Sequence, residues 1–200
     1  LCRWAEAVED AGCRLVGQFV DPGRGRHHPG RNPSAIGASA LPDDISWTMP
    51  RALEAGEIRR MVEDFAATAA RLRRAGFSGV ELSCGHGHLF HQFLSPQSNV
   101  WEDSYGGDIE GRTRLAREFA AAIRAAGGSG FILGLKFPGD DGVPGGIGID
   151  ESALLLHRIL DDGGIDYVSV AQGAHHNSLE MHVPDRSYPP LAYRALARRL

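Results

Sequence analysis

Strand-like and helix-like segments alternate along this chain, and that alternation constrains its fold more than any other feature. Each short apolar run of strand length is followed by a stretch that contains glycine and proline, and then by an amphipathic helical pattern. The expected strands are residues 13–20, 79–84, 131–137 and 165–171. The expected helices are residues 2–12, 57–76, 110–128, 150–164 (with Asp150 as N-cap) and 189–200. Alternating strands and helices predict a parallel sheet with helices outside it.

Connections that follow the expected strands are long, whereas those that lead from a helix back to a strand are short. Residues 21–55, 85–108, 138–149 and 172–188 are expected to be loops. In a TIM (β/α)8 barrel, the loops after the strands form the active face. A doubly wound sheet that binds a nucleotide is the alternative, but the chain has neither a GxGxxG nor a GxxxxGK[ST] motif. The pattern therefore favours the α/β class and a TIM barrel.

A complete barrel of this type takes about 250 residues and contains eight strands. We therefore expect residues 1–200 to form a single, incomplete barrel domain with four strands. Its open sheet edges would pack against strands outside the sequence. The chain begins at Leu1 in a segment with helical spacing, which also indicates a piece of a longer protein. One alternative is therefore that residues 1–200 are a fragment with no activity of its own.

Composition and charge exclude several kinds of partner. The formal net charge is −4 and the arginines are scattered, so no nucleic-acid surface is expected. No run approaches the roughly 18 apolar residues of a membrane span, and we expect no secretory leader. Cys2, Cys13 and Cys84 fit no disulfide framework, which favours a reduced, cytoplasmic protein. A small-molecule substrate remains as the expected partner, and a homo-oligomer stays open.

Polar and titratable side chains gather near the C-terminal ends of the expected strands. Because parallel strands of a barrel end on one rim, these side chains are expected to converge there. Lys136 stands out among them, since it is the single lysine among 21 basic residues. The residues near these strand ends are Gln18, Asp21, Gly23, Arg24, Ser83, Cys84, His86, His88, Lys136, Ser169, Gln172, His175 and His176.

One block of the sequence resembles a known family. Residues 76–128, with GVELSCGHGHLFHQFLSPQSN followed by YGGDIEGR, are similar to the signature region of the old yellow enzyme family. GQFVDPGR (17–24) resembles the family's Q-L-x-H-x-G-R strand and loop, and GLKFPGDD (134–141) occupies the strand that usually reads G-x-R. The likeness follows the same order along nearly the whole chain. It implies an FMN-dependent NAD(P)H:flavin oxidoreductase on a TIM barrel, of which roughly strands three to six are present.

The resemblance implies that two residues bind the flavin. Gln18 would hydrogen-bond the polar pyrimidine edge of the isoalloxazine, because an amide offers both a donor and an acceptor. Lys136 stands where the family usually has an Arg beside flavin N1, and a cation there stabilises the anionic reduced flavin. A lysine supplies a point charge without the guanidinium fork. NADH or NADPH would be the reductant, and some relatives carry an iron–sulfur cluster further along their chains.

Three further positions align with the family's substrate site, which is usually His-x-x-His or His-x-x-Asn followed two residues later by Tyr. Here they hold Ser83, His86 and His88, of which His86 alone matches. The resemblance implies that His86 and His88 are catalytic and that Ser83 and His86 contact the substrate, with His88 in place of the proton-donating Tyr. His175, in the loop after the fourth expected strand, is a further candidate substrate contact. His176 and His182 lie in the same loop.

The substitution of GHL for GYL is similar to a branch of the family that oxidatively demethylates N-methyl amines or N-methylated amino acids. We therefore favour hydride transfer between flavin N5 and a small organic substrate, in the form of oxidative N-demethylation. The alternative within the family is an ene-reductase that acts on α,β-unsaturated carbonyls with NAD(P)H. From another class, the pair His86-x-His88 is typical of a metal-dependent barrel hydrolase. We expect no metal, because that pair lies on the wrong strand for such a site.

Other residues of the block are expected to serve the structure. His91 begins the HQFLSP turn and is expected to pack rather than to act on substrate. Cys84 is expected to be a small buried residue. Asn99 and Asp103 are expected to brace the loop, the two glycines of YGG to make its turn, and Glu110 to pair with Arg112.

Overall fold

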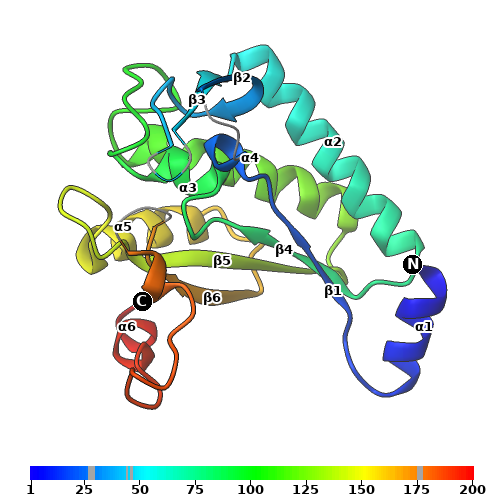
Figure 1. The fold of residues 1–200 in the computed structure, drawn as a ribbon. Coiled ribbons are helices and arrows are strands. Elements are labelled where there is room, and N and C mark those ends of the chain that lie inside the picture. Colours follow the sequence, from blue (N-terminus) through cyan, green and yellow to red (C-terminus); the bar gives the residue numbers. More distant parts are fainter. Residues whose placement is uncertain (27–29, 44, 46, 175–177) are drawn as a thin grey trace.

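The computed structural model of the chain describes residues 1–26, 30–43, 45, 47–174 and 178–200. Its centre is a four-stranded parallel sheet in the order β1–β4–β5–β6 (Figure 1). The strands are β1 (Val16–Phe19), β4 (Gly79–Ser83), β5 (Ile132–Asp140) and β6 (Tyr167–Gln172). Strand order follows chain order across the whole sheet, as in a barrel, whereas a doubly wound sheet reverses direction at a switch point. The prediction of an incomplete TIM barrel is confirmed.

Helices connect the strands along one face of the sheet. α2 (Ala55–Arg74) precedes β4, α4 (Ile109–Gly127) leads to β5, and α5 (Ile149–Leu160) leads to β6; all three contribute to one core (Figure 1). α1 (Cys2–Asp10) precedes β1, and α6 (Arg194–Arg199) follows β6. Within the part of the chain described here, no helix is long and apolar enough to span a bilayer.

Local sequence signals set the helix boundaries. Glu54 and Glu57 form a reciprocal capping box at the start of α2. At the start of α4, the Asp108 carboxylate accepts the amide proton of Gly111 at 2.9 Å. The expected N-cap of α5 was wrong: Gly148 is the N-cap, and Asp150 lies in the first turn. An acidic side chain there still stabilises the helix, because it faces the positive end of the helix dipole.

Three expected loops contain regular structure that the sequence did not reveal. Within residues 21–55 lie the short 3-10 turn η1 (Gly23–Gly25) and the strands β2 (Gly30–Gly37) and β3 (Thr48–Ala52). These strands pair with each other and have a register shift, so their period-two signal is short and interrupted. Within residues 85–108 lies α3 (Leu89–Leu94), and η2 (Leu179–Met181) lies within 172–188. Six residues are too few for a helical period to stand out.

Side chains alternate between the two faces of the sheet, as the pleat of a strand requires. Leu82 of β4 and Leu135 of β5 are buried on the face that packs against the helices. Their neighbours in sequence, Glu81 and Lys136, lie on the opposite face, which is the interior of the barrel. The sheet therefore has one apolar face and one polar face, and the polar face carries the residues predicted to bind the cofactor.

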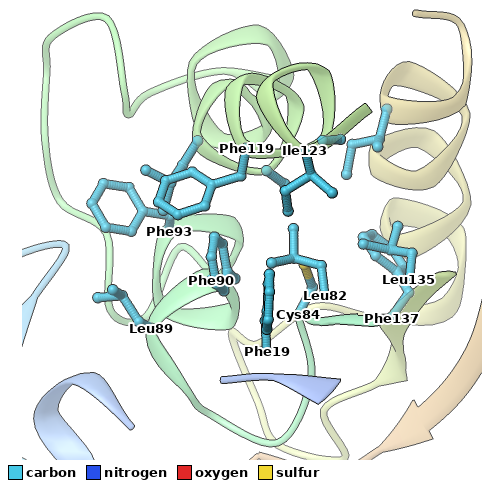
Figure 2. Close-up of a cluster of buried hydrophobic side chains, with 14 of the residues drawn as sticks. Phe19, Leu82, Cys84, Leu89, Phe90, Phe93, Phe119, Ile123, Leu135 and Phe137 are labelled. Carbon is cyan, nitrogen blue, oxygen red and sulfur yellow. The ribbon is translucent and has the colours of Figure 1, made fainter. Parts of the chain in front are cut away.

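An aromatic cluster fixes the short helix α3 to this scaffold. Figure 2 shows Phe90 and Phe93 beside Phe119 and Ile123 of α4, above Phe19 and Leu82. The ring centroids of Phe90 and Phe119 are 4.8 Å apart, with an edge-to-face interplanar angle of 85°. Such pairs contribute about 0.5–1.5 kcal/mol beyond the burial of their area. Since α3 begins directly after His88, the core positions the loop that carries the candidate catalytic histidines.

Candidate active site

Glu81 occupies the centre of the polar face and joins three strands. It is 9% exposed, and its carboxylate accepts a hydrogen bond from Gln18 Nε2 of β1 at 2.6 Å. On the other side, the hydroxyl of Tyr167 on β6 donates to Glu81 at 3.1 Å. The ammonium of Lys136 lies 4.0 Å from the same carboxylate. Glu81 was not among the predicted site residues; the available signal was a charged residue at an inward position of an otherwise apolar strand.

The contact between Tyr167 and Glu81 depends on a glycine between them. Gly134 pairs with both residues in the sheet register. A Cβ atom at position 134 would lie 2.1 Å from the Tyr167 ring, so only glycine leaves the ring room to cross β5. Burial and the nearby Glu81 carboxylate raise the pKa of Tyr167 to about 12. The phenol therefore stays protonated at neutral pH and can donate to Glu81.

The loop after β4 presents the two candidate catalytic histidines through an unusual backbone. His86 has a φ of 62° and Gly87 a φ of 72°, so two consecutive residues adopt the left-handed conformation. The His86 ring stacks on the ring of His182, with centroids 4.4 Å apart and an interplanar angle of 27°. His182 belongs to the loop after β6, and its Nε2 lies 3.0 Å from the Ala174 carbonyl oxygen. The structure therefore brings together histidines that are distant in sequence.

The environment of these histidines favours the uncharged imidazole. Burial, together with the electrostatic effect of His182 and Lys136, lowers the pKa of His86 to about 4. Burial, followed by the nearby His182, also lowers the pKa of His88 below its usual value. At neutral pH these rings are hydrogen-bonding groups and proton acceptors rather than cations.

His91 lies buried in α3, as expected for a packing residue, and it also has polar contacts. The Gly87 amide donates a hydrogen bond to His91 Nδ1 at 2.8 Å. On the other side of the ring, Nε2 lies 2.8 Å from a carboxylate oxygen of Asp141, in the loop after β5, and both side chains are 1% exposed. Sequence analysis could not find this pair, because Asp141 lies in a different strand–helix loop.

The remaining predicted site residues are placed as follows. Ser83 is buried at the end of β4 and pairs with Lys136 in the sheet register. Cys84 is fully buried, and burial raises the pKa of its thiol, so it is the inert small residue expected. His175 and His176 lie outside the described residues. Among the residues that are described, no group of three or more His, Cys, Asp or Glu side chains is arranged to hold a metal.

The YGG loop serves the structure, with one correction. Asn99 Nδ2 donates to the carbonyl oxygens of Phe93 and Tyr105, at 2.7 and 2.8 Å, so the predicted bracing by Asn99 is confirmed. The predicted pair between Glu110 and Arg112 was wrong. Residues two apart on a helix point in different directions.

Each of those two residues has other partners. Glu110 forms ion pairs with Arg117 and Arg158 on the surface. The buried Arg112 donates to the Leu94 carbonyl oxygen at 2.8 Å and pairs with Glu151 of α5. Arg112 therefore ties α3 to α5 through α4.

Comparison with known proteins decides the family. A sequence model described as the NADH:flavin oxidoreductase / NADH oxidase family matches residues 2–187. The chain belongs to this family. The match confirms the resemblance predicted from residues 76–128 and with it a family of oxidoreductases that bind FMN.

Individual relatives agree with this assignment. A "Metal reductase" of Desulforamulus reducens and an "N,N-dimethylglycine/sarcosine dehydrogenase" of Chromohalobacter salexigens are each 33% identical to this chain over 196 residues, 96% of it. The chain spans 29% and 28% of their respective lengths. A solved complex of 2-naphthoyl-CoA reductase aligns with 98% of this chain and 32% of its own, at a TM-score of 0.85 and 24% identity. The last likeness supports the fold.

The residues on the polar face fit the ring of FMN. Gln18 is exposed at the sheet end and gives an Nε2 hydrogen to Glu81, which leaves its carbonyl oxygen and its second amide hydrogen for a ligand. Lys136 adds a half-buried cation two strands away. An amide and a cation on one rim match the donors, acceptors and developing negative charge of the flavin's pyrimidine edge.

Proposed function

We propose that the protein is an FMN-dependent oxidoreductase that oxidatively demethylates a small N-methylated amine bearing a carboxylate. The observation that carries the proposal is the convergence of His86, His88 and His182 beside Lys136, on the rim that also holds Gln18. When bound, FMN would supply the hydride acceptor at N5. NAD(P)H or an electron-transfer partner would complete the cycle.

Gln18 and Lys136 would hold the flavin ring. Gln18 would present its amide oxygen to a ring N–H, because one of its own amide hydrogens is directed to Glu81. Lys136 would compensate negative charge at the pyrimidine edge. Ser83, one strand away from Lys136, would contribute its hydroxyl to the pocket.

The histidines would bind the substrate and accept its proton. A tertiary amine is largely protonated at neutral pH, and its nitrogen lone pair must be free before hydride can leave the methyl carbon. An uncharged imidazole of His88 suits that proton transfer, because burial lowers its pKa. His86 and His182 would face the substrate carboxylate. The name of the relative that acts on N,N-dimethylglycine and sarcosine supports this substrate class.

Reduction of an α,β-unsaturated carbonyl is the second candidate. It requires a group that gives a proton to the substrate carbon, and the family usually has a Tyr at the position of His88. A histidine with a lowered pKa is a poorer donor than acceptor at neutral pH, which favours amine oxidation.

The test uses the full-length gene product. Its visible spectrum is recorded, then dimethylglycine is added anaerobically in one cuvette, and an enone with NADPH in another. Bleaching of the flavin bands by dimethylglycine, with no bleaching by the unmethylated control glycine, supports the proposal. Enone-dependent loss of NADPH without reaction of the amine would favour the ene-reductase. A colourless protein that carries zinc would refute both and revive the barrel hydrolase.

A further inference from the structure

Gly87, the residue between the two catalytic candidates, is held on both sides by consecutive residues of α3. The Gly87 amide donates to His91 Nδ1 at 2.8 Å, and the Gly87 carbonyl oxygen accepts from Gln92 Nε2 at 2.8 Å. Both bonds are buried. Since Gly87 separates His86 from His88, these two bonds set the direction in which each of those side chains leaves the backbone.

The backbone here needs such support. His86 adopts a left-handed φ of 62°, which is uncommon for a residue with a Cβ atom. Maintaining this backbone conformation costs free energy. Strained conformations of this kind persist where surrounding contacts fix them. The turn has its own bond from the His88 amide to the Gly85 carbonyl oxygen at 3.4 Å, and the side chains that contact Gly87 are those of His91 and Gln92.

The hydrogen bond from Gly87 also determines the tautomer of His91. Because Nδ1 accepts a hydrogen bond, it carries no hydrogen of its own, and the ring hydrogen must be on Nε2. That nitrogen lies 2.8 Å from Asp141 Oδ1, a buried polar contact without hydrogen-bond geometry, and neither atom has a hydrogen-bond partner in the part of the chain that is described. The other oxygen, Oδ2, accepts the Ile147 amide proton at 2.8 Å. Asp141 therefore accepts a hydrogen bond at Oδ2 and places Oδ1 in close contact with His91 Nε2.

Asp141 extends this arrangement to the third loop of the rim. Its carbonyl oxygen accepts from the Ser178 hydroxyl at 2.5 Å, and that hydroxyl oxygen accepts the Ala174 amide proton at 2.8 Å. The Ala174 carbonyl oxygen lies 3.0 Å from His182 Nε2, and the His182 ring stacks on His86. The contacts thus form a closed chain that runs from Gly87 through the loops after β5 and β6 to His86.

We propose that His91 and Asp141 are positioning residues that fix the His86–Gly87–His88 turn and hold it in register with the loop that carries His182. The role of the two histidines in catalysis rests on the proposed function. The effect of His91 and Asp141 on the turn does not, so the two can be tested separately.

Three variants of the full-length, FMN-loaded protein separate the contacts. In His91→Asn, the amide oxygen takes the place of Nδ1 and keeps an acceptor for Gly87, but the contact with Asp141 is lost. In His91→Gln, the side chain reaches Asp141 but offers Gly87 no acceptor. In Asp141→Asn, the NH2 group of the side chain must face either His91 Nε2–H or the Ile147 backbone amide. Both of these groups are hydrogen-bond donors, so neither can accept from it. His157→Asn, on the exposed face of α5, is the matched control.

Hydrogen exchange at the Gly87 amide is the first measurement, because it is independent of any substrate. We expect exchange to be about tenfold faster or more in His91→Gln and Asp141→Asn, and within about threefold of wild type in His91→Asn and in the control. Flavin content and the visible spectrum of each variant verify that the fold is retained. Unchanged exchange at Gly87 in a folded His91→Gln protein would overturn the proposal.

The second measurement is the limiting rate of flavin reduction by dimethylglycine. We expect it to fall about tenfold in His91→Gln and Asp141→Asn, with a smaller change in His91→Asn, while FMN stays bound. If wild type is not reduced by the amine but Gly87 exchange follows the expected order, the proposed function fails and the positioning role stands. If exchange follows that order but all variants reduce at the wild-type rate, the positioning role in catalysis is refuted.

Discussion

Gln18 on β1 donates its amide hydrogen to Glu81 on β4 at 2.6 Å, directly across the sheet register. This bond fixes which end of the Gln18 amide is free for a ligand. We predict that Glu81→Gln lets the Gln18 amide rotate and raises the dissociation constant of FMN about tenfold, which corresponds to about 1.4 kcal/mol. The measurement is equilibrium binding of FMN to the full-length apoprotein. Glu63→Gln, on the exposed face of α2, is the control, and equal affinities of the two variants would contradict the prediction.

The charge of Lys136 is predicted to set the reduction potential of the bound flavin. Replacing it by Met removes the cation beside the pyrimidine edge, so the reduced flavin should be less stable and the potential more negative by about 30 mV or more. Lys136→Arg keeps the charge and should stay close to wild type. The potential is measured by equilibration with a reference dye. A Met variant with an unchanged potential would place Lys136 away from the flavin.

The histidine environment predicts a defined titration. His86 has a pKa of about 4 because of burial and the neighbouring positive charges, so its ring should stay neutral well below its usual value of 6.5. Replacing His182 by Asn removes one of those charges, and the pKa of His86 should rise toward 6.5. The measurement is an NMR titration of the imidazole Hε1 signals, assigned with His86→Asn. An unperturbed titration near 6.5 in wild type would rule out this environment.

The lowered pKa of His86 also predicts how the stability of the folded protein depends on pH. The unfolded chain binds a proton at His86 below about pH 6.5, whereas the folded protein binds it only near pH 4. Folding is therefore disfavoured as pH falls through that window. His86→Asn should lose less thermal stability than wild type between neutral pH and pH 5, and Asn tolerates the left-handed backbone of this position. Parallel losses in the two proteins would contradict the prediction.

The aromatic cluster predicts a large cost for truncation. Phe119 is fully buried, and its ring makes edge-to-face contacts with Phe65 and Phe90 at centroid distances of 4.9 and 4.8 Å. Phe119→Ala should destabilise the domain by about 3–5 kcal/mol, and Phe119→Leu by clearly less. Denaturant unfolding followed by fluorescence provides the values. Because the cluster anchors α3, weaker FMN binding is expected to accompany the loss.

Sequence periodicity was sufficient to predict the main strands and helices, because each has a long or strongly apolar pattern. It was insufficient for β2 and β3, which pair mainly with each other and lie in a stretch rich in Gly and Pro. Asp150 was expected to cap α5, but the N-cap lies two residues earlier at Gly148, and a carboxylate is compatible with either the cap or the first turn.

The site was only partly predictable for a different reason. Gln18, His86, His88 and Lys136 could be named as candidates because they lie near strand ends, a property of the local sequence, and their roles stay predictions. His182, Asp141 and Glu81 gain their meaning from partners in other units of the barrel, and no local pattern marks those pairs. His91 was correctly expected to be buried, but its contact with the Gly87 amide required the fold of the turn.

Because Gly134 has no side chain, the size of the residue at position 134 limits the size of the residue at position 167 on the neighbouring strand. The interior of a barrel is filled in layers by side chains from alternate strands, and here the Tyr167 ring fills the space that position 134 leaves empty. The side chains at positions 134 and 167 therefore share one space in the interior. A larger residue at position 134 is compatible only with a smaller one at position 167. Any exchange of that kind would leave Glu81 with one hydrogen-bond donor fewer inside the barrel.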